Sequence, residues 1–205
     1  MDNIIDISFI IPCHNLEFYI HPLLLSIQAL DLKDIKSEFI FILDDCIDHT
    51  ESMIKHFMTD FNYSIIKCNH HSCGLSRNEG LKVAKGEFIW FLDGDDWIIY
   101  PPAAKECIEL MRNNDLEIIR VLYVSNYYKI FYPSMVWQYI YRHSLINDIE
   151  FTARQPHEDV EFMDKVLKKI QTDDIIVYNI PTYYYNYQRP GSNMTQYMTT
   201  GKIEP

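Results

Sequence analysis

Two clusters of aspartates each follow an apolar run of the sequence. They are Asp44 and Asp45, which follow the run 39–43, and Asp93, Asp95 and Asp96, which follow the run 88–92. Carboxylates this close repel one another, and a cation bound between them keeps them ionised. Oxygen ligands favour Mg²⁺ or Mn²⁺, and proteins typically hold Mg²⁺ with one or two carboxylates and the phosphates of a substrate. The second cluster therefore predicts a divalent metal that carries a phosphorylated ligand, although a solvated Asp-Gly turn would give the same short pattern.

The first half of the chain alternates short apolar runs with helical patterns. We expect strands at 4–11, 39–43, 63–67, 87–92 and 117–124, and helices at 18–30, 50–61, 76–84 and 101–112. Such alternation is typical of βαβ units on a mainly parallel sheet flanked by helices. Ligands of open α/β sheets bind beyond the carboxyl ends of the strands, so both aspartate clusters should lie at the ligand-binding edge.

The second half is rich in tyrosine, with a helical pattern at 158–169 and an apolar run at 175–180. We expect this half to complete the sheet and to form the second wall of the ligand site. A length of 205 residues suits one domain with a sizeable core, so we expect a single domain over 1–205.

Charge and composition exclude some classes of function. The 18 basic and 29 acidic residues give a net charge of −11, whereas a nucleic-acid-binding protein presents a basic face. The five cysteines contain no CxxC pair, which predicts reduced thiols in the cytoplasm. No apolar stretch reaches the length of a membrane span, so we expect no transmembrane segment, while peripheral association with the inner face of the membrane stays open. The segment CNHHSC (68–73) offers soft ligands, but structural zinc usually draws on two separated ligand pairs.

Several segments resemble, in their order and spacing, the pattern of the family 2 glycosyltransferases. Within residues 5–112 they are ISFIIPCHN, FIFILDDC and GLSRNEGLKVAKGEFIWFLDGDDW, and further on VWQYIYRHSLI (136–146), HEDVEF (157–162) and YYYNYQRPGSNMT (183–195). The resemblance implies the GT-A fold, a Rossmann-like α/β fold that binds nucleotide sugars. It also implies a nucleotide-sugar-binding half at 1–112 and a smaller half at 113–205 for the acceptor and the catalytic base.

The resemblance further implies how a nucleotide-sugar donor, expected to be UDP-linked, is bound with Mn²⁺ or Mg²⁺. The implied residues are Pro12, His14 and Asn15 for base and ribose, Asp45 for the base N3–H, Arg77 for the diphosphate or base, Asp93 for ribose or metal, Asp95 for the metal, and Arg189 with Ser192 for the donor phosphates. Gly94 has no side chain, so a bulky ligand could approach the backbone there. Asp96 is expected to support the metal ligands without binding the metal itself, or to lie on the acceptor side. Arg77 could instead pair with Glu79 on its own helix.

Glu158 and Asp159 resemble the acidic pair that opens a helix in this family, in which one carboxylate is the catalytic base. We expect Asp159 to be the base, ionised by the nearby helix N-terminus, in a metal-dependent, inverting transfer of a hexosyl or N-acetylhexosaminyl group. The expected acceptor is a hydroxyl of a growing surface glycan or a lipid-linked glycan. One or two of the tyrosines could stack on an acceptor sugar, although tyrosines more often belong to the core or the rim.

Three departures from the family pattern leave an alternative open. His14 replaces the usual tyrosine, Cys46 replaces a glycine, and the segment 125–136 is shorter than is common in the family. A non-catalytic nucleotide-sugar-binding homologue with a weakened acceptor site would carry the same donor motifs. A phosphohydrolase with an Asp-x-Asp motif is disfavoured, because those enzymes place Thr or Val where this chain has Asp96-Trp97.

Overall fold

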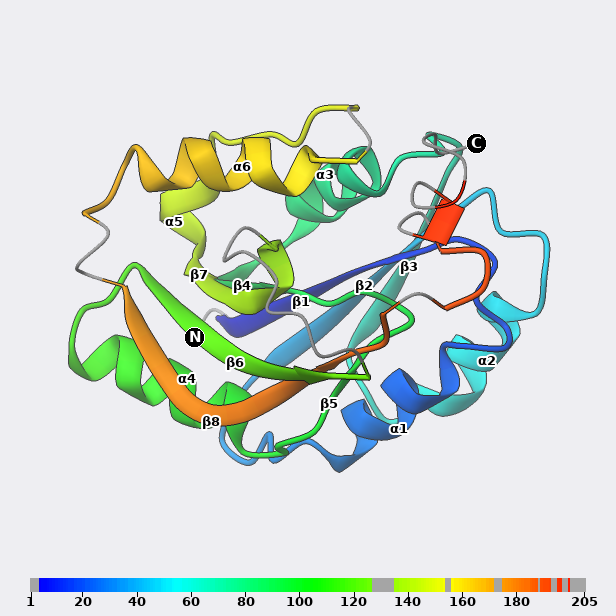
Figure 1. The fold of residues 1–205 in the computed structure, drawn as a ribbon. Coiled ribbons are helices and arrows are strands. Elements are labelled where there is room, and N and C mark those ends of the chain that lie inside the picture. The colour runs from blue at the N-terminus through cyan, green and yellow to red at the C-terminus, as the bar shows by residue number, and fades with distance from the viewer. Residues whose placement is uncertain are drawn as a thin grey trace.

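The computed structural model of the chain describes residues 4–126, 135–153, 156–171, 175–187, 189–192, 195, 196 and 199. Its elements (Figure 1) are β1 (Ile5–Cys13), α1 (His21–Ala29), β2 (Ser37–Asp44), α2 (Thr50–Phe57), β3 (Tyr63–Cys68), α3 (Cys73–Val83), β4 (Gly86–Phe91), β5 (Trp97–Ile98), α4 (Ala103–Asn113), β6 (Ile118–Ser125), η1 (Val136–Gln138), β7 (Tyr139–Arg142), α5 (His143–Ile146), α6 (Glu158–Leu167) and β8 (Ile176–Tyr185). Most of the shortened segment at 125–136 lies outside the described residues.

Within the described residues, eight strands form one sheet in the order β3-β2-β1-β4-β7-β6-β8-β5. β1 pairs in parallel with β2 and with β4, and β2 pairs in parallel with β3. Beyond β4 the sheet is mixed, because β7 runs antiparallel to both of its neighbours and β5 runs antiparallel to β8. The α/β architecture is as expected, and the four strands β3, β2, β1 and β4 form a continuous parallel part of the sheet.

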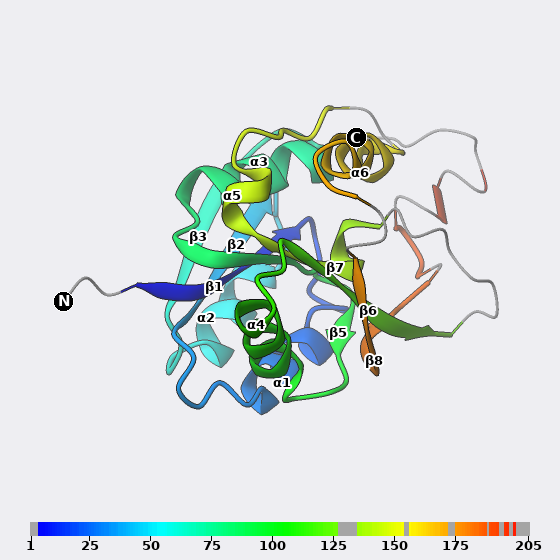
Figure 2. The same ribbon diagram turned by 90° about the vertical axis from the view of Figure 1, so that its left-hand side faces the viewer.

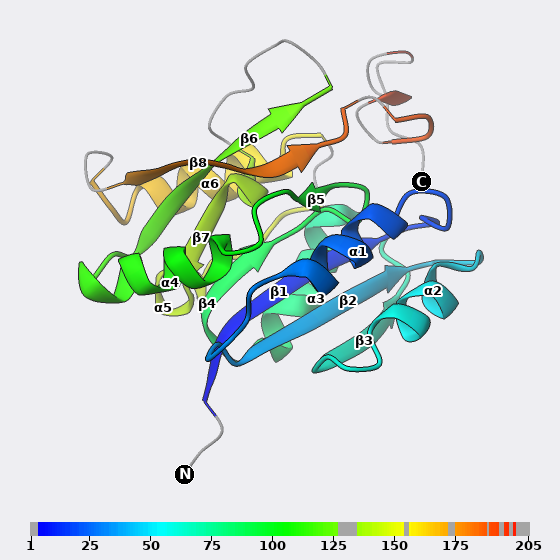
Figure 3. The ribbon, with the colours of Figure 1, turned by 90° about the horizontal axis from the view of Figure 1, so that it is seen from below.

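Helices cover both faces of this curled sheet (Figures 2 and 3). The helices α3, α5 and α6 lie on one face, and α1, α2 and α4 lie on the other. Successive side chains of β1 point to opposite faces of the sheet and so contribute to both layers of the core. Phe9 packs on the α1 side and Ile10 on the α3 side, and both are fully buried. A strand buried on both faces reads as a continuous apolar run, which is why its pattern was recognisable in the sequence.

The carboxyl ends of β1, β2 and β4 meet at one edge of the sheet, because the three strands are parallel neighbours. Asp45 follows β2 at this edge, and Asp93 follows β4. Both acidic clusters therefore lie at the edge at which open α/β sheets generally bind their ligands.

Asp44 ties the start of α3 to the end of β2. Its carboxylate accepts hydrogen bonds from the backbone N–H groups of His70 (2.6 Å), His71 (3.0 Å) and Ser72 (3.0 Å) and from the hydroxyl of Ser76 (2.8 Å). Burial pushes the pKa of Asp44 upward, but these hydrogen bonds outweigh that effect and hold the pKa below its usual value. Asp44 is therefore a structural residue that sets where α3 begins.

The Asp44→Ala substitution should lower the free energy of unfolding by about 3 kcal/mol, because it leaves several buried donors without an acceptor. The contribution of a carboxylate with a depressed pKa is present above its unfolded pKa and disappears as the pH falls below about 4. Urea denaturation of wild type and variant at pH 7 and pH 3 measures both effects. The exposed neighbour Asp45 provides the control, and equal losses for Asp44→Ala and Asp45→Ala at pH 7 would contradict this role.

Candidate active site

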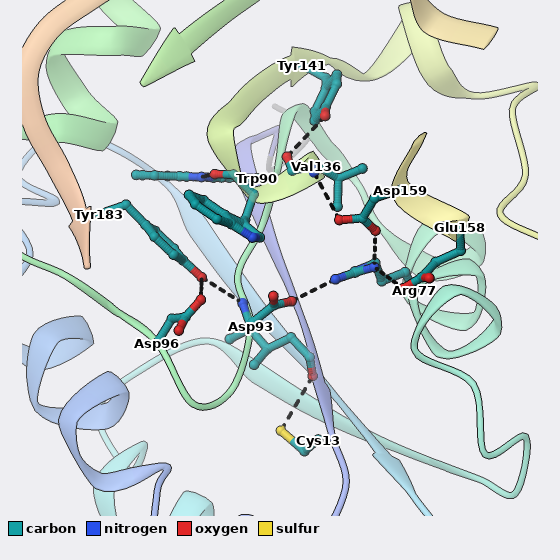
Figure 4. A network of polar contacts seen from close by, with 12 residues as sticks. Cys13, Arg77, Trp90, Asp93, Asp96, Val136, Tyr141, Glu158, Asp159 and Tyr183 are labelled. Carbon is teal, nitrogen blue, oxygen red and sulfur yellow. Dashed lines mark hydrogen bonds and ion pairs between the residues drawn. The ribbon is translucent and has the colours of Figure 1, made fainter. Parts of the chain in front are cut away.

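The guanidinium of Arg77, on α3, lies at the centre of the site (Figure 4). One of its nitrogens is 2.7 Å from a carboxylate oxygen of Asp93, and another is 2.7 Å from Asp159 and 3.5 Å from Glu158. The side chain is only 2% exposed, and the guanidinium lies 5.4 Å from the ring centroid of Phe151. Arg77 therefore joins the end of β4 to the first turn of α6 and does not pair with Glu79, which contacts His70 and Lys82 instead.

Asp159 is a buried carboxylate with two partners. One oxygen contacts Arg77, and the other accepts a hydrogen bond from the backbone N–H of Val136 at 3.3 Å. Burial raises the pKa of Asp159 to about 6, although the charge of Arg77 opposes the shift. The helix N-terminus was expected to favour the ionised form, but the cost of desolvation is larger. Asp159 is still mostly ionised at pH 7, so it can accept a proton.

Asp93 resembles Asp159 in its electrostatics. Burial raises its pKa to about 6, while Arg77 opposes the shift and the neighbouring charge of Asp95 adds to it. The side chains of Asp93 and Asp95 are 22% and 19% exposed, and Asp95 forms an ion pair with Arg189. Arg189 also lies 4.6 Å from the ring centroid of Tyr19. The C-terminal segment thus contacts the second acidic cluster, at the residue expected to bind the metal.

Asp96 has a different role from its two neighbours. It is 1% exposed, accepts a hydrogen bond from the hydroxyl of Tyr183 at 2.8 Å, and accepts another from the backbone N–H of Asn186 at 2.8 Å. The hydroxyl of Tyr183 in turn accepts a hydrogen bond from the backbone N–H of Asp93 at 3.0 Å. Asp96 therefore anchors β8 to the acidic loop, a structural task that its place in the motif did not reveal.

The donor set suits a divalent cation bound together with a phosphorylated ligand. Among the described residues, no group of three or more His, Cys, Asp or Glu side chains could hold a metal by itself. Asp93 and Asp95 are two partly exposed carboxylates, and the charge of Asp95 adds to the raised pKa of Asp93. Mg²⁺ is typically held by one or two carboxylates and by phosphate oxygens, so this pair fits that mode of binding. The described part of the chain likewise shows no zinc cluster at 68–73.

The loops after β1 and β2 form the adjoining part of the edge. The Nδ1 atom of the exposed His14 lies 2.6 Å from the carbonyl oxygen of Asp44, and the side chain of Asn15 accepts a hydrogen bond from Ile47 at 3.0 Å. Asp45 is exposed and has a positive φ of 50°. The buried Pro12 is the second-last residue of β1. Of the four residues expected around the base and ribose, His14, Asn15 and Asp45 thus lie on two loops that hydrogen bonds hold together, and Pro12 lies at the end of the strand before the first loop.

Two residues of this edge also have packing roles. A Cβ atom at Gly94 would lie 2.4 Å from Leu16 Cδ1 and 3.1 Å from the carbonyl oxygen of Pro12, so the packing of the chain on itself favours glycine there, whether or not a ligand approaches the backbone. Cys46 donates a hydrogen bond from its thiol to the carbonyl oxygen of Cys13 at 3.2 Å. The residue that replaces the family's glycine therefore links the ends of β1 and β2.

Two contributors to the site had no signal in the sequence analysis. The backbone N–H of Val136 holds Asp159, and the hydroxyl of Tyr183 holds the acidic loop (Figure 4). A backbone donor cannot be recognised from residue type. Tyr183 belongs to a run of three tyrosines. Only the alternation of side chains along a strand, which puts neighbouring residues on opposite faces, could have distinguished Tyr183 from Tyr184.

The fold and the site together define an α/β protein with two acidic clusters beyond the carboxyl ends of its parallel strands, and comparison with known proteins gives its family. The family model described as "Glycosyl transferase family 2" matches residues 8–166, so the chain belongs to glycosyl transferase family 2. Among curated relatives, poly(ribitol-phosphate) beta-N-acetylglucosaminyltransferase TarS of Staphylococcus aureus is 37% identical over 95 residues. That match covers 44% of this chain and 16% of TarS, so the chain spans about a sixth of that relative's length.

Solved structures share the fold. A crystal structure of S. aureus TarS 1-349 in complex with UDP-GlcNAc superposes with a TM-score of 0.83 at 24% identity, over 93% of this chain and 61% of that one. The mannosyltransferase PcManGT of Pyrobaculum calidifontis, in complex with GDP-Man and Mn²⁺, superposes with a TM-score of 0.69 at 14% identity, over 97% and 66% of the two chains. The expected GT-A fold is thereby confirmed. None of the helices in the part of the chain that the structure describes has the length and apolar character needed to cross a bilayer.

The Arg77→Met substitution should destabilise the chain by about 3–5 kcal/mol at pH 7.5 in EDTA, because it leaves the buried Asp159 and the partly exposed Asp93 without their cation. Both carboxylates have raised pKa values in the folded chain, so the folded state takes up protons as the pH falls through about 6. Protonation removes the unpaired charges, and the deficit should therefore shrink at pH 5. Urea denaturation at the two pH values measures the change.

Arg112→Met is the matched control for this experiment. Arg112 also bridges two carboxylates, those of Asp6 and Glu87, but its side chain is 39% exposed. A surface pair contributes about 1 kcal/mol or less, so this variant should change little at either pH. If Arg77→Met lost no more unfolding free energy than Arg112→Met, or if its loss did not depend on pH, the stabilising role of the ion pairs between Arg77, Asp93 and Asp159 would be contradicted.

Proposed function

We propose that this chain is an inverting glycosyltransferase domain that moves a sugar from a UDP-linked donor to a hydroxyl group of an acceptor glycan. The observation that carries the proposal is the buried guanidinium of Arg77, which contacts Asp93 and Asp159 at 2.7 Å each. A nucleotide-sugar held at Asp93 and Asp95 is thereby bound next to a carboxylate that can act as a base. Membership of glycosyl transferase family 2 supports the reaction class.

Asp159 would act as the general base in a single displacement. It takes the proton of the acceptor hydroxyl while the hydroxyl oxygen attacks the anomeric carbon from the face opposite the diphosphate. The bond from that carbon to the diphosphate oxygen breaks, and its electron pair leaves with UDP, so the configuration inverts. A pKa of about 6 lies close to the working pH, which is where a general base is most effective.

Asp93 and Asp95 would hold Mn²⁺ or Mg²⁺, which supplies positive charge to the diphosphate as it leaves. Arg189, now paired with Asp95, would exchange this carboxylate for the donor phosphates, to which its planar fork is suited. The Mn²⁺ in the complex of PcManGT with GDP-Man supports a divalent metal in this fold.

Asp45 is proposed to select the base. Its exposed carboxylate, at the end of β2 and near His14, can accept the N3–H of uracil. The TarS complex with UDP-GlcNAc supports a uridine nucleotide, whereas PcManGT shows that the fold also accommodates GDP-Man. We therefore propose UDP on the basis of Asp45.

The division of the chain and its place of action are proposals too. We propose that residues 1–112 bind the donor, and that residues 113–205 supply the base and bind the acceptor. The acceptor could be a glycan, or a polyol-phosphate polymer of the kind named for TarS. All five cysteines are free thiols, which supports action in a reducing compartment such as the cytoplasm.

Replacing the base tests the chemistry separately from donor binding. Asp159→Asn keeps the shape but cannot accept a proton, so UDP release should fall by about 10²–10⁴-fold while affinity for UDP-GlcNAc changes little. Glu158→Gln should have a milder effect, because Glu158 lies farther from Arg77, at 3.5 Å. Coupled assays of UDP release and calorimetry measure the two quantities. Loss of transfer in Glu158→Gln alone would make Glu158 the base, and donor binding without any UDP release in wild type would favour the non-catalytic homologue.

Removing the metal tests the donor site. UDP should bind appreciably only with Mn²⁺ or Mg²⁺, and Asp95→Ala should abolish this dependence, since the diphosphate is bound through the cation. Glu109→Ala, an exposed carboxylate on α4, is the matched control and should leave UDP binding metal-dependent. Calorimetry that gives the same UDP affinity in EDTA and in Mn²⁺ would argue against the metal site.

A further inference from the structure

Each of the two carboxylates proposed to bind the metal is paired with an arginine. Asp93 contacts Arg77 at 2.7 Å, and Asp95 forms an ion pair with Arg189. Among the described residues, no other side chain forms an ion pair with Asp95. The two guanidinium groups therefore supply, at these two carboxylates, the positive charge that a divalent cation would otherwise supply.

The two arginines differ in how firmly they are held. Arg77 is 2% exposed and contacts three carboxylates, whereas the side chain of Arg189 is 13% exposed and contacts one. The guanidinium of Arg189 also lies over the ring of the half-buried Tyr19, 4.6 Å from its centroid, and this cation–π contact helps to keep it beside the acidic loop. Arg77 is thus a fixed part of the site, and Arg189 is the arginine that can change partners.

Arg189 lies in the segment that follows β8 and is hydrogen-bonded to its near neighbours. Its carbonyl oxygen accepts hydrogen bonds from the hydroxyl of Thr195 at 2.9 Å and from the backbone N–H of Ser192 at 3.2 Å. The hydroxyl of Ser192 in turn donates to that of Thr195 at 3.0 Å. None of these bonds has to break when the side chain of Arg189 leaves Asp95.

We propose that Arg189 blocks the metal position in the free chain, so that a divalent cation binds firmly only when a nucleotide diphosphate draws the guanidinium away from Asp95. The inference rests on the proposed function and deepens it, because it gives Arg189 an inhibitory contact in addition to its contact with the phosphates. The planar guanidinium binds phosphate oxygens through paired hydrogen bonds, and the diphosphate offers more negative charge than the single carboxylate that it replaces. Metal and nucleotide thus enter the site together.

Removing the guanidinium should have opposite effects on two binding events. Without Arg189 the carboxylate of Asp95 is open to a cation, so the metal alone should bind more tightly. The diphosphate loses a partner, so UDP with the metal should bind more weakly. A residue that served only to contact the phosphates would show the second effect without the first.

Electron paramagnetic resonance of Mn²⁺ measures the free metal and so reports metal binding without any reaction. Arg189→Gln should bind Mn²⁺ alone about tenfold more tightly than wild type, because no ion pair competes for Asp95. In the same variant, calorimetry in saturating Mn²⁺ should show UDP affinity lowered about tenfold. Arg189→Lys keeps the charge but not the planar fork, so it should retain the weak metal binding of wild type and still lose UDP affinity.

Two further variants control for charge and for the place of binding. Arg112→Gln removes the same charge from an arginine that pairs with Asp6 and Glu87, in the first turns of the strands β1 and β4 and away from their carboxyl ends, and should leave both affinities unchanged. Adding Asp95→Asn to Arg189→Gln should abolish the gain in Mn²⁺ affinity, because the gain comes from that carboxylate.

The inference is overturned if Arg189→Gln binds Mn²⁺ no more tightly than wild type, or if Arg112→Gln shows the same gain. A gain that survives in the double variant would also overturn it, because the metal would then bind elsewhere. The Mn²⁺ measurement contains no nucleotide. Failure of wild type to bind UDP with any metal would therefore refute the proposed function, while the gain in Mn²⁺ affinity would still decide whether Arg189 excludes the metal.

Discussion

The pairing of one buried guanidinium with carboxylates from two distant parts of the chain governs this structure. Arg77 is 2% exposed and contacts Asp93, 16 residues later, and Asp159, 82 residues later. Burying any of these charges alone would cost several kcal/mol, so each depends on the others. Burial raises the pKa values of Asp93 and Asp159 to about 6, against the opposing charge of Arg77, and a carboxylate with a raised pKa is a stronger base than in water.

The position of Arg77 follows from the way α3 is fixed. Asp44 binds the three backbone amides before the helix, which sets its first turn. The helix then lies close on the sheet at Gly80, where a Cβ atom would come within 2.5 Å of Ile10. A helix held at its start and pressed against β1 presents Arg77 toward the end of β4. The way in which α3 is fixed to β1 and β2 therefore determines where Arg77 forms its ion pairs with Asp93 and Asp159.

The sequence predicted the parts of the site better than their connections. The long apolar runs of β1, β2 and β4 and the order of the motifs were enough to place Asp45 directly after β2, Asp93 after β4 and Asp159 in the first turn of α6. The pairing of Arg77 with two of these carboxylates was not predictable, because a helical pattern does not say which distant charges its residues meet. β5 and β7 are only two and four residues long, too short for a periodic signal. The strand expected at 175–180 is longer in the structure, because β8 continues through the tyrosine run to Tyr185. Along this run the side chains alternate between the two faces of the strand.

A crystal structure of the chain with UDP and Mn²⁺ would test the central claim most directly, because it places donor, metal and base in one view. We expect Mn²⁺ to bind directly to Asp95 and the diphosphate to bind to the metal. Uracil should lie beside Asp45, and Arg77 should still be paired with Asp159. Arg189 should have left Asp95 for the diphosphate. Binding of Mn²⁺ and UDP away from Asp95, or a complex in which Arg77 has left Asp159, would contradict the view that one guanidinium joins donor binding to catalysis.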